Sequence, residues 1–463
     1  TVSHTIDVPF DGDGAGCGGL NWGQQHILGA TRNLGSPMNM CAVRVLEPTA
    51  RLEEFVDELR FYLNRFQSMR TLLRFSPDAP PIQEVFAAGR APLAVIDIPA
   101  DADADTVAAE LAAEQEKLPF DEEREFPIRM LLVRQTSILT HLVTVLNHFA
   151  TDGAGAFVMY EDYLRRDPAT GLAPHPVPTH PLDLTAQQST PAGRRQSDSS
   201  LRYWERELRA LPLRPAREPV AGAGARYRCA RLRSVPMLLG ATRVAHRLRC
   251  DVSAVLLALF ATALARAAGE PTVAAQVLVS NRFRPGMADI VGNVSQTGLF
   301  VVDVGGATID EVVERAQRAV TRTYKYAYFD WEQWRELVPR IERERGAEFE
   351  LCYYNDRPSQ RSATVPGPEP SAEEVMAAAA VPAPITWTDL PFFNERLMVS
   401  IDSVADADAA EAEAVTLLVH ADTWFVPPAE MEELARSMED LAIAAACDAN
   451  TPTRLGALER SGT

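Results

Sequence analysis

The residues best suited to chemistry are a histidine and an aspartate four positions apart, at the end of an apolar run. The stretch "LVTVLNHFATDGAGAFVMYED" (142–162) places His148 where the apolar, β-branched pattern stops, with Asp152 and Gly153 in the following loop. Histidine is the side chain best suited to proton transfer near neutral pH. A strand that ends in a loop is a rigid support for such a group. His148 is the first candidate for a general base.

Two roles stay open for Asp152 on spacing alone. Its carboxylate could orient His148, as in a catalytic triad, or it could pair with an arginine and hold the loop in shape. Gly153 permits a tight turn into the next helix, whose first N–H groups would point back at the site. A histidine that ends a strand can equally be structural, so the motif has to be weighed with the rest of the chain.

The composition is that of an ordinary globular chain. Its 463 residues, 46% apolar and 23% charged, predict two domains or subdomains. No apolar run approaches the roughly 20 residues that span a bilayer, and the start lacks the pattern of a signal peptide. The six cysteines are scattered without a CxxC pair, which argues against a disulfide framework and favours a reducing cytoplasm. We see no P-loop, dinucleotide fingerprint or metal-ligand cluster.

The charge is segregated along the chain. The net charge of −18 disfavours nucleic-acid binding. Residues 194–249, however, carry 14 arginines and four acids, so this window is about +10 and the remainder about −28. Two interpretations stay open: solvated helix faces, or a docking face for an acidic partner or a phosphate-bearing ligand.

Apolar periodicity predicts helices and strands around the motif. Residues 128–135 and 141–148 fit a hairpin that ends at His148, and a helix begins close behind, at Gly155. Residues 166–200, rich in Pro, Ser, Thr and Gly, are interpreted as a linker, and 358–384 as a loop insertion. The remaining expected helices are 20–30, 50–69, 106–118, 200–211, 234–248, 253–268, 309–326 and 428–447; the remaining strands are 39–46, 92–98, 271–280, 298–304, 349–356, 395–404 and 414–422, the last two forming a hairpin around the acidic tip "ADADAAEAE".

The string "NHFATDG" resembles the His-His-x-x-x-Asp-Gly motif of condensation domains and of the wider chloramphenicol acetyltransferase-like superfamily. Further stretches resemble the family's other segments in the same order, and together they cover essentially the whole chain. These stretches are "NWGQQHIL" (21–28), "FQSMRTLLRF" (66–75), "LPFDEEREFPIRMLLVR" (118–134), "LRYWEREL" (201–208) and the long segment 250–297, which contains "VSNRFRPGMADIVGNVSQT".

The resemblance implies an α/β (α+β) fold of two chloramphenicol acetyltransferase-like subdomains in a V-shaped pseudodimer with a central substrate tunnel. The N-terminal subdomain, residues 1–180, would carry the motif, and residues 181–463 would form the C-terminal one. An acyl thioester would enter from one side, on the phosphopantetheine arm of a carrier protein or on coenzyme A. An amine or alcohol acceptor would enter from the other. No permanently bound cofactor is implied.

The resemblance also implies roles for individual residues. His148 would act as general base or orient the nucleophile, and Asp152 would be structural, ion-paired with Arg282. Gly153 would place its N–H near the reacting carbonyl, where it could stabilise an oxyanion. Ser295, Thr297, Trp331 and Asn355 are candidates to line the tunnel. For Trp331 and its neighbour Trp334 core packing is the first expectation and tunnel lining the alternative, and for Asn355 a turn is favoured over the tunnel. His26, His246 and His420 receive no chemical role; surface or packing positions are expected for the first two.

The chain departs from the family pattern at several positions. Asn147 stands where the first motif histidine is expected, in a structural position where its amide can still form hydrogen bonds. "DGAG" (152–155) replaces the usual "DGWS", which would remove bulk and widen the tunnel. "SQT" (295–297) replaces "VNT". No "DFGWG" motif is present, and no adenylation or carrier segment follows in the sequence, which favours a free-standing condensation enzyme.

Three functional hypotheses follow. The first is an acyltransferase of natural-product biosynthesis that moves an acyl or aminoacyl group from a carrier-protein thioester to an amine or alcohol. The second is a coenzyme A-dependent O- or N-acyltransferase. The third is a catalytically degenerate member that binds or recruits a partner, suggested by Asn147 and by the altered "DGAG".

Overall fold

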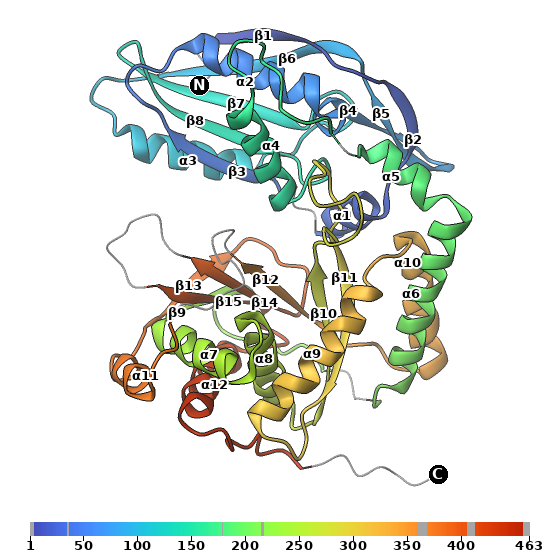
Figure 1. The fold of residues 1–463 in the computed structure, drawn as a ribbon, viewed down its shortest axis with the longest axis vertical. Helices are drawn as coiled ribbons and strands as arrows, with labels where there is room; N and C mark the ends of the chain where they lie inside the picture. Colours follow the sequence, from blue (N-terminus) through green and yellow to red (C-terminus); the bar gives the residue numbers. More distant parts are fainter. Residues whose placement is uncertain are drawn as a thin grey trace. The chain divides into compact units, whose positions relative to one another are not determined.

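The computed structural model describes residues 4–34, 37–177, 179–213, 217–358, 368–404 and 413–456 (Figure 1). It divides the chain into two compact units. Unit 1 comprises residues 1–198, 280–296 and 329–332; unit 2 comprises residues 199–279, 297–328 and 333–463. Two short segments from the second half of the sequence therefore belong to the same unit as the motif histidine.

Unit 1 is built on a five-stranded sheet with helices on both faces (Figure 1). The strand order is β1-β6-β7-β8-β3, and only the β6–β7 pair is parallel. A smaller sheet has the order β2-β5-β4. The bounds are β1 (His4–Asp11), β2 (Gly16–Gly19), β3 (Met40–Val45), β4 (Thr71–Ser76), β5 (Ala79–Val85), β6 (Ala88–Ile98), β7 (Ile128–Gln135), β8 (Ile138–Leu146), α1 (Trp22–Leu34), α2 (Leu52–Arg65), the 3₁₀ turn η1 (Gln67–Arg70), α3 (Ala104–Lys117), α4 (Gly153–Arg165) and α5 (Pro181–Gln188).

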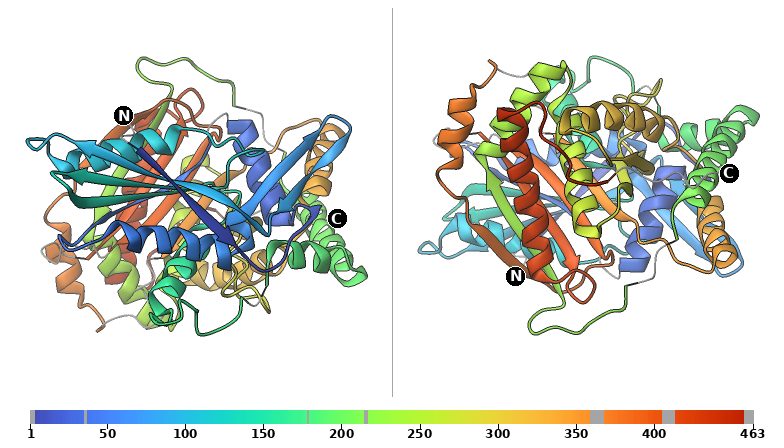
Figure 2. Two further views of the ribbon diagram at one scale, coloured as in Figure 1. Left: turned by 90° about the horizontal axis from the view of Figure 1, so that it is seen from above. Right: turned by 90° about the horizontal axis from the view of Figure 1, so that it is seen from below.

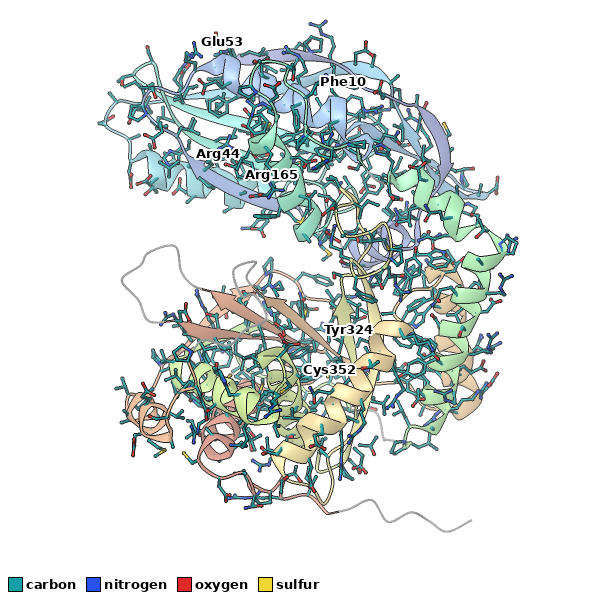
Figure 3. The ribbon with its side chains drawn as sticks, in the orientation of Figure 1. Phe10, Arg44, Glu53, Arg165, Tyr324 and Cys352 are labelled. Carbon is teal, nitrogen blue, oxygen red and sulfur yellow. The ribbon has the colours of Figure 1, made fainter. Side chains whose placement is uncertain are left out.

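Alternation along β8 explains how this sheet carries two cores. Leu142 and Leu146 point into the core beneath α2 and α4, while Val143 and Val145 point to the opposite face, against α3. In the first of these cores Phe10, labelled in Figure 3, packs edge-to-face on Phe126 with ring centroids 5.2 Å apart. Because β8 is fixed from both sides, the loop that follows it begins from a rigid point.

Unit 2 is built on a seven-stranded mixed sheet of order β11-β10-β12-β14-β15-β9-β13. Helices α7, α8, α9 and α12 cover one face, and the right panel of Figure 2 shows α12 along the strands. The bounds are β9 (Tyr227–Ser234), β10 (Thr272–Val279), β11 (Gln296–Asp303), β12 (Cys352–Pro358), β13 (Ile385–Leu390), β14 (Leu397–Val404), β15 (Ala414–Asp422), α7 (Val235–Leu248), α8 (Val252–Ala268), α9 (Ile309–Lys325), α11 (Ala372–Ala379) and α12 (Pro428–Cys447). Helices α6 (Pro191–Ala210) and α10 (Trp331–Arg345) have residues in both units.

Most of α8 is buried on every side, as its apolar sequence predicts. Within the described ranges no single helix is long and apolar enough to cross a bilayer; α7 and α8 meet that criterion only as a pair, bent by 112°.

Two expectations about connecting segments are wrong. Residues 166–200 are not a plain linker, because they contain α5 and the first half of α6. A capping box at His180 and Asp183 and a proline in the first turn start α5, so the prolines that suggested a linker here begin a helix. Residues 358–384 are not a plain loop, because they contain α11. The expected hairpin of 395–404 and 414–422 is present as β14 and β15, and most of its acidic tip lies outside the described residues.

Candidate active site

His148 lies in the short loop between β8 and α4, at the boundary between core and surface. The ring is half-buried, whereas the next residues Phe149, Ala150 and Thr151 are buried and Gly153 is exposed. The buried residues anchor the loop in the core of unit 1. The imidazole is thus held on a rigid support while part of it stays open.

Hydrogen bonds at His148 define which ring nitrogen carries the proton. Nδ1 is 3.1 Å from the carbonyl oxygen of Thr151, which can only accept a hydrogen bond. Asn293 lies against the same nitrogen, with Nδ2 at 3.2 Å, but the same amide donates to the His148 carbonyl at 2.9 Å. The shorter contact, with the Thr151 carbonyl, favours the neutral tautomer with its hydrogen on Nδ1. Its Nε2 keeps a lone pair for proton transfer.

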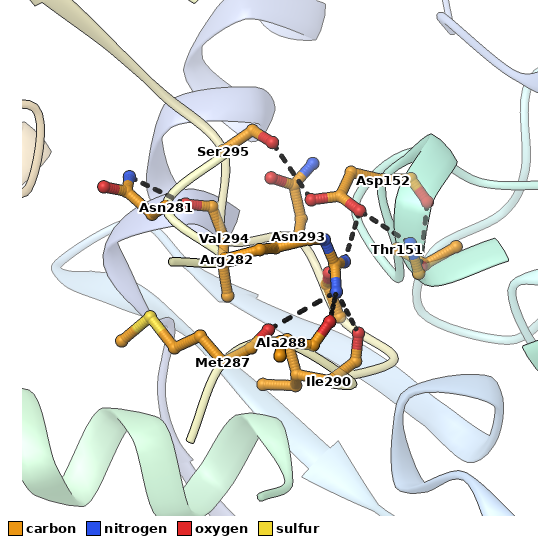
Figure 4. Close-up of polar contacts among 12 residues, drawn as sticks. Thr151, Asp152, Asn281, Arg282, Met287, Ala288, Ile290, Asn293, Val294 and Ser295 are labelled. Carbon is orange, nitrogen blue, oxygen red and sulfur yellow. Dashed lines mark hydrogen bonds and ion pairs between the residues drawn. The ribbon is translucent and has the colours of Figure 1, made fainter. Parts of the chain in front are cut away.

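The carboxylate of Asp152 forms hydrogen bonds with Gly155, Ser295 and Arg282 (Figure 4). Its Oδ1 accepts from the Gly155 N–H at 2.9 Å, which caps the start of α4, and its Oδ2 accepts from Ser295 Oγ at 3.0 Å. Arg282 Nη2 donates to Oδ1. In the described part of the chain, no hydrogen bond joins Asp152 to His148. Of the two roles that spacing left open, the geometry favours the pairing with arginine.

Arg282 ties the segment 280–296 to the motif loop. Besides Asp152, its Nη1 donates to the carbonyls of Ala288 at 3.1 Å and Ile290 at 2.9 Å (Figure 4). The side chains of the ion pair are only 11% and 7% exposed, for Arg282 and Asp152 respectively. Little water reaches the pair, so removing either partner would leave a buried charge without compensation.

The two glycines of "DGAG" have different surroundings. A Cβ at Gly155 would lie 2.3 Å from Thr151 Oγ1 and 2.9 Å from Arg282 Nη2, whereas one at Gly153 would meet nothing within 4 Å. Thr151 and Arg282 thus fill the space beside Gly155, whereas the space beside Gly153 is open. The expectation that "DGAG" widens a tunnel stays a prediction.

Asn147, which replaces the first motif histidine, shapes the turn before His148. It is 5% exposed, and its Oδ1 accepts from the Phe149 N–H at 2.9 Å, as in an Asx turn. Its Nδ2 reaches Glu122 Oε1 at 3.5 Å. Burial raises the pKa of Glu122, and the contact with Asn147 opposes that shift. The Asn147 side chain thus stabilises the backbone of the loop through its hydrogen bond with the Phe149 N–H.

The remaining expected site residues divide between the units. Ser295 and Trp331 belong to unit 1 with His148, whereas Thr297 and Asn355 belong to unit 2. Thr297 is buried and donates to Gln276 Oε1 at 3.1 Å. Trp331 is also buried, which agrees with the expectation of core packing, and it contacts the ring of His26. The assignment of these residues to a tunnel stays a prediction.

Two residues near the motif were missed by the sequence interpretation. Asn293 contacts His148 directly, and His26 lies against the backbone of Ser295. Neither follows a spacing rule, since each reaches the site from a distant part of the chain. The only available signal was their position inside the resembling stretches at 21–28 and 250–297.

Many arginines of the stretch 194–249 form ion pairs with acids of unit 2. Two of these ion pairs join Arg226 to Asp422 at 2.7 Å and Arg228 to Asp389 at 2.9 Å. Five further arginines of residues 194–249 also form ion pairs, namely Arg206, Arg209, Arg217, Arg243 and Arg247. At least half of the 14 arginines are thereby engaged within the protein. In the ranges that the structure describes, no group of three His, Cys, Asp or Glu side chains could hold a metal ion.

The mixed α/β fold is the chloramphenicol acetyltransferase-like fold of condensation domains. Among solved structures, the condensation domain that mediates chain release from the enacyloxin polyketide synthase matches with a TM-score of 0.70 at 16% identity, over 96% of this chain and 85% of that one. The condensation-domain family model matches residues 24–352. The chain belongs to the condensation-domain family.

Two curated relatives are peptide synthetases. CymA of Salinispora arenicola, a probable non-canonical nonribosomal peptide synthetase, is 26% identical over 319 residues, 64% of this chain. The phosphinothricin tripeptide synthetase PhsB of Streptomyces viridochromogenes is 27% identical over 281 residues, 58% of this chain. The matches span only 4% of CymA and 23% of PhsB. Family membership supports a condensing, acyl-transfer role.

Proposed function

We propose that the protein is an acyltransferase of natural-product biosynthesis. It would join an acyl or aminoacyl thioester, carried on the phosphopantetheine arm of a carrier protein, to an amine or alcohol acceptor and so form an amide or an ester. The observation that carries the proposal is the state of His148: the Thr151 carbonyl holds the proton on Nδ1, which leaves the Nε2 lone pair free on a half-buried ring.

In this proposal Nε2 of His148 accepts a proton from the acceptor as its nitrogen or oxygen attacks the thioester carbonyl. A new C–N or C–O bond forms, and the carbonyl becomes a tetrahedral oxyanion. When that intermediate collapses, the C–S bond breaks and His148 returns the proton to the departing thiolate. The products are an amide or ester and a free thiol, so proton and electron pair balance without any redox partner.

The start of α4 provides the second element of the proposal. Gly153 is the first residue of α4, it is exposed, and its missing side chain leaves open space beside it. The first N–H groups of a helix have no partner within the helix and carry partial positive charge. We assign the Gly153 N–H to the developing oxyanion. Asp152 and Arg282 would keep this helix end in place.

The relatives support a carrier-bound donor. Both curated relatives are described as peptide synthetases, one of them as a probable one, and one of the matched solved structures belongs to a polyketide synthase. The phosphopantetheine thioester would be a substrate rather than a resident cofactor. The widespread pairing of arginines in residues 194–249 makes this stretch a poor candidate for the whole docking surface, since paired charges attract a partner only weakly.

The test offers the purified protein an acyl group in two forms, on a phosphopantetheine-loaded carrier protein and on coenzyme A, with a panel of amines and alcohols. Mass spectrometry follows the loss of the acyl group from the donor and the gain of a new amide or ester. Transfer from the carrier that disappears in His148→Ala supports the proposal. Transfer from coenzyme A alone would favour the second hypothesis, and carrier binding without turnover on either donor would favour the degenerate one.

A further inference from the structure

His26 on α1 is a second imidazole near the motif loop, and it contacts the segment 280–296. Its Nδ1 lies 3.4 Å from the backbone carbonyl of Ser295, and its ring packs at a tilt of 54° against Trp331 with centroids 4.3 Å apart. Ser295 in turn donates to Asp152, so one short segment contacts both His26 and the motif loop. All these residues belong to unit 1.

The packing around α1 fixes the position of this ring. A Cβ at Gly23 would lie 2.3 Å from the carbonyl oxygen of Asn293, and one at Gly29 would lie 2.7 Å from Trp331 Nε1. Only glycines allow α1 to approach both neighbours so closely. The amide of Gln296 also exchanges hydrogen bonds with the backbone of Phe329, which holds the segment that carries Trp331.

His26 and His148 both contact the segment 280–296, at positions that are two residues apart. Asn293 holds His148, and Ser295 holds His26. Two residues of chain span at most roughly 7 Å, so the two points of contact on this segment lie close together. Burial lowers the pKa of His26 to about 4, and the charge of a protonated His148 acts in the same direction. The His26 ring is neutral at physiological pH.

The contact with Ser295 favours one tautomer of His26. The Ser295 carbonyl can only accept, so the contact is a hydrogen bond when Nδ1 carries the hydrogen, and Nε2 then carries the lone pair. Among the residues that the structure describes, Nε2 has no hydrogen-bond partner, although the ring is partly buried. A hydrogen-bond acceptor in this position favours a ligand that donates.

We propose that His26 binds the acceptor substrate, with Nε2 accepting a hydrogen bond from its nucleophilic nitrogen, and that the site is built for a primary amine. The inference rests on the proposed function. A primary amine offers two N–H groups: His148 removes one proton, and the second N–H donates to His26. An alcohol or a secondary amine has only one hydrogen on the attacking atom, so it cannot satisfy both imidazoles.

Two small acceptors that differ by one N–H test the proposal. Hydroxylamine and N-methylhydroxylamine both give hydroxamates that form coloured iron complexes, here with octanoyl-N-acetylcysteamine thioester as donor. The variant His26→Phe keeps a ring against Trp331 and lacks the nitrogen. We expect the preference in kcat/KM for hydroxylamine over its N-methyl analogue to fall roughly three- to tenfold in this variant, mainly through KM.

The controls separate the failure of this inference from failure of the proposed function. An unchanged preference in His26→Phe, with His148→Ala inactive, overturns the role of His26 alone. Full activity in His148→Ala overturns the proposed function instead.

If the wild type turns over neither acceptor, labelling of the protein with diethyl pyrocarbonate at pH 7 tests whether Nε2 of His26 is accessible. The lone pair of an accessible neutral imidazole attacks a carbonyl carbon of this reagent and takes up its ethoxycarbonyl group, with ethanol and CO2 released. Labelling of His26 supports the open Nε2; an unlabelled His26 beside a labelled exposed His175 refutes it.

Discussion

Replacing Asp152 by alanine tests the division of labour between the motif aspartate and histidine. Three contacts disappear: the N-cap to Gly155, worth about 1 kcal/mol, the hydrogen bond from Ser295, worth about 1 kcal/mol, and the buried ion pair with Arg282. Truncating one partner of a buried pair costs about 3–5 kcal/mol. The three contributions overlap, so we expect Asp152→Ala to lower the free energy of unfolding by about 3–5 kcal/mol.

Two matched variants sharpen this prediction. Asp152→Asn keeps an oxygen that can cap α4, so it should lose about 1 kcal/mol less than the alanine variant. Asp97→Ala removes the partner of Arg134 in the same unit, where the pair is 46% and 30% exposed, and should cost less than about 1 kcal/mol. Urea unfolding followed by hydrogen exchange in peptides of residues 149–165 reads unit 1 separately from unit 2. A loss in Asp152→Ala no greater than in Asp97→Ala would refute the structural role.

Further predictions concern packing and pH. Gly155→Ala should destabilise unit 1 by about 1–3 kcal/mol, because its Cβ would meet Thr151, whereas Gly153→Ala should unfold like the wild type; urea unfolding compares the two. His26, with its pKa near 4 against 6.5 when unfolded, binds fewer protons in the folded state; unit 1 should lose stability as the pH falls from 6.5 to 4, and His26→Phe should weaken that loss. Burial raises the pKa of Glu395 to about 7 from 4.5, so its contribution is present at low pH and lost as the pH rises through 7. Glu395→Gln should flatten that dependence in hydrogen exchange of unit 2.

Elements with their own complete local signals were predictable from sequence. The helix α9 has a capping box at Thr308 and Glu311 and a buried stripe, and α12 keeps its apolar period over 20 residues. By contrast, the strand β9 was missed because Arg231 and Arg233 alternate with the buried Ala230 and Leu232. Its arginines were interpreted as part of the basic stretch 194–249. The segment is a strand because it pairs with β15 and β13.

In the candidate site, too, local sequence signals predict some residues and not those that arrive by tertiary packing. His148 could be chosen from its place after an apolar strand, since that support is local. Asp152 and Arg282 are 130 residues apart, and the motif resemblance alone connected them before the structure did. Asn293 and His26 reach the motif through tertiary packing that depends on glycine contacts of α1, and no periodicity in the sequence encodes such an approach.

The most direct test of His148 as the general base is the single-turnover rate of His148→Ala with a loaded carrier and an acceptor that the wild type uses. The rate is measured on protein whose hydrogen exchange matches the wild type. We expect a loss of at least about a hundredfold, because a general base contributes about 10²–10⁴ in rate. A variant that is equally well folded and transfers the acyl group at the wild-type rate would contradict the assignment of His148 as the base.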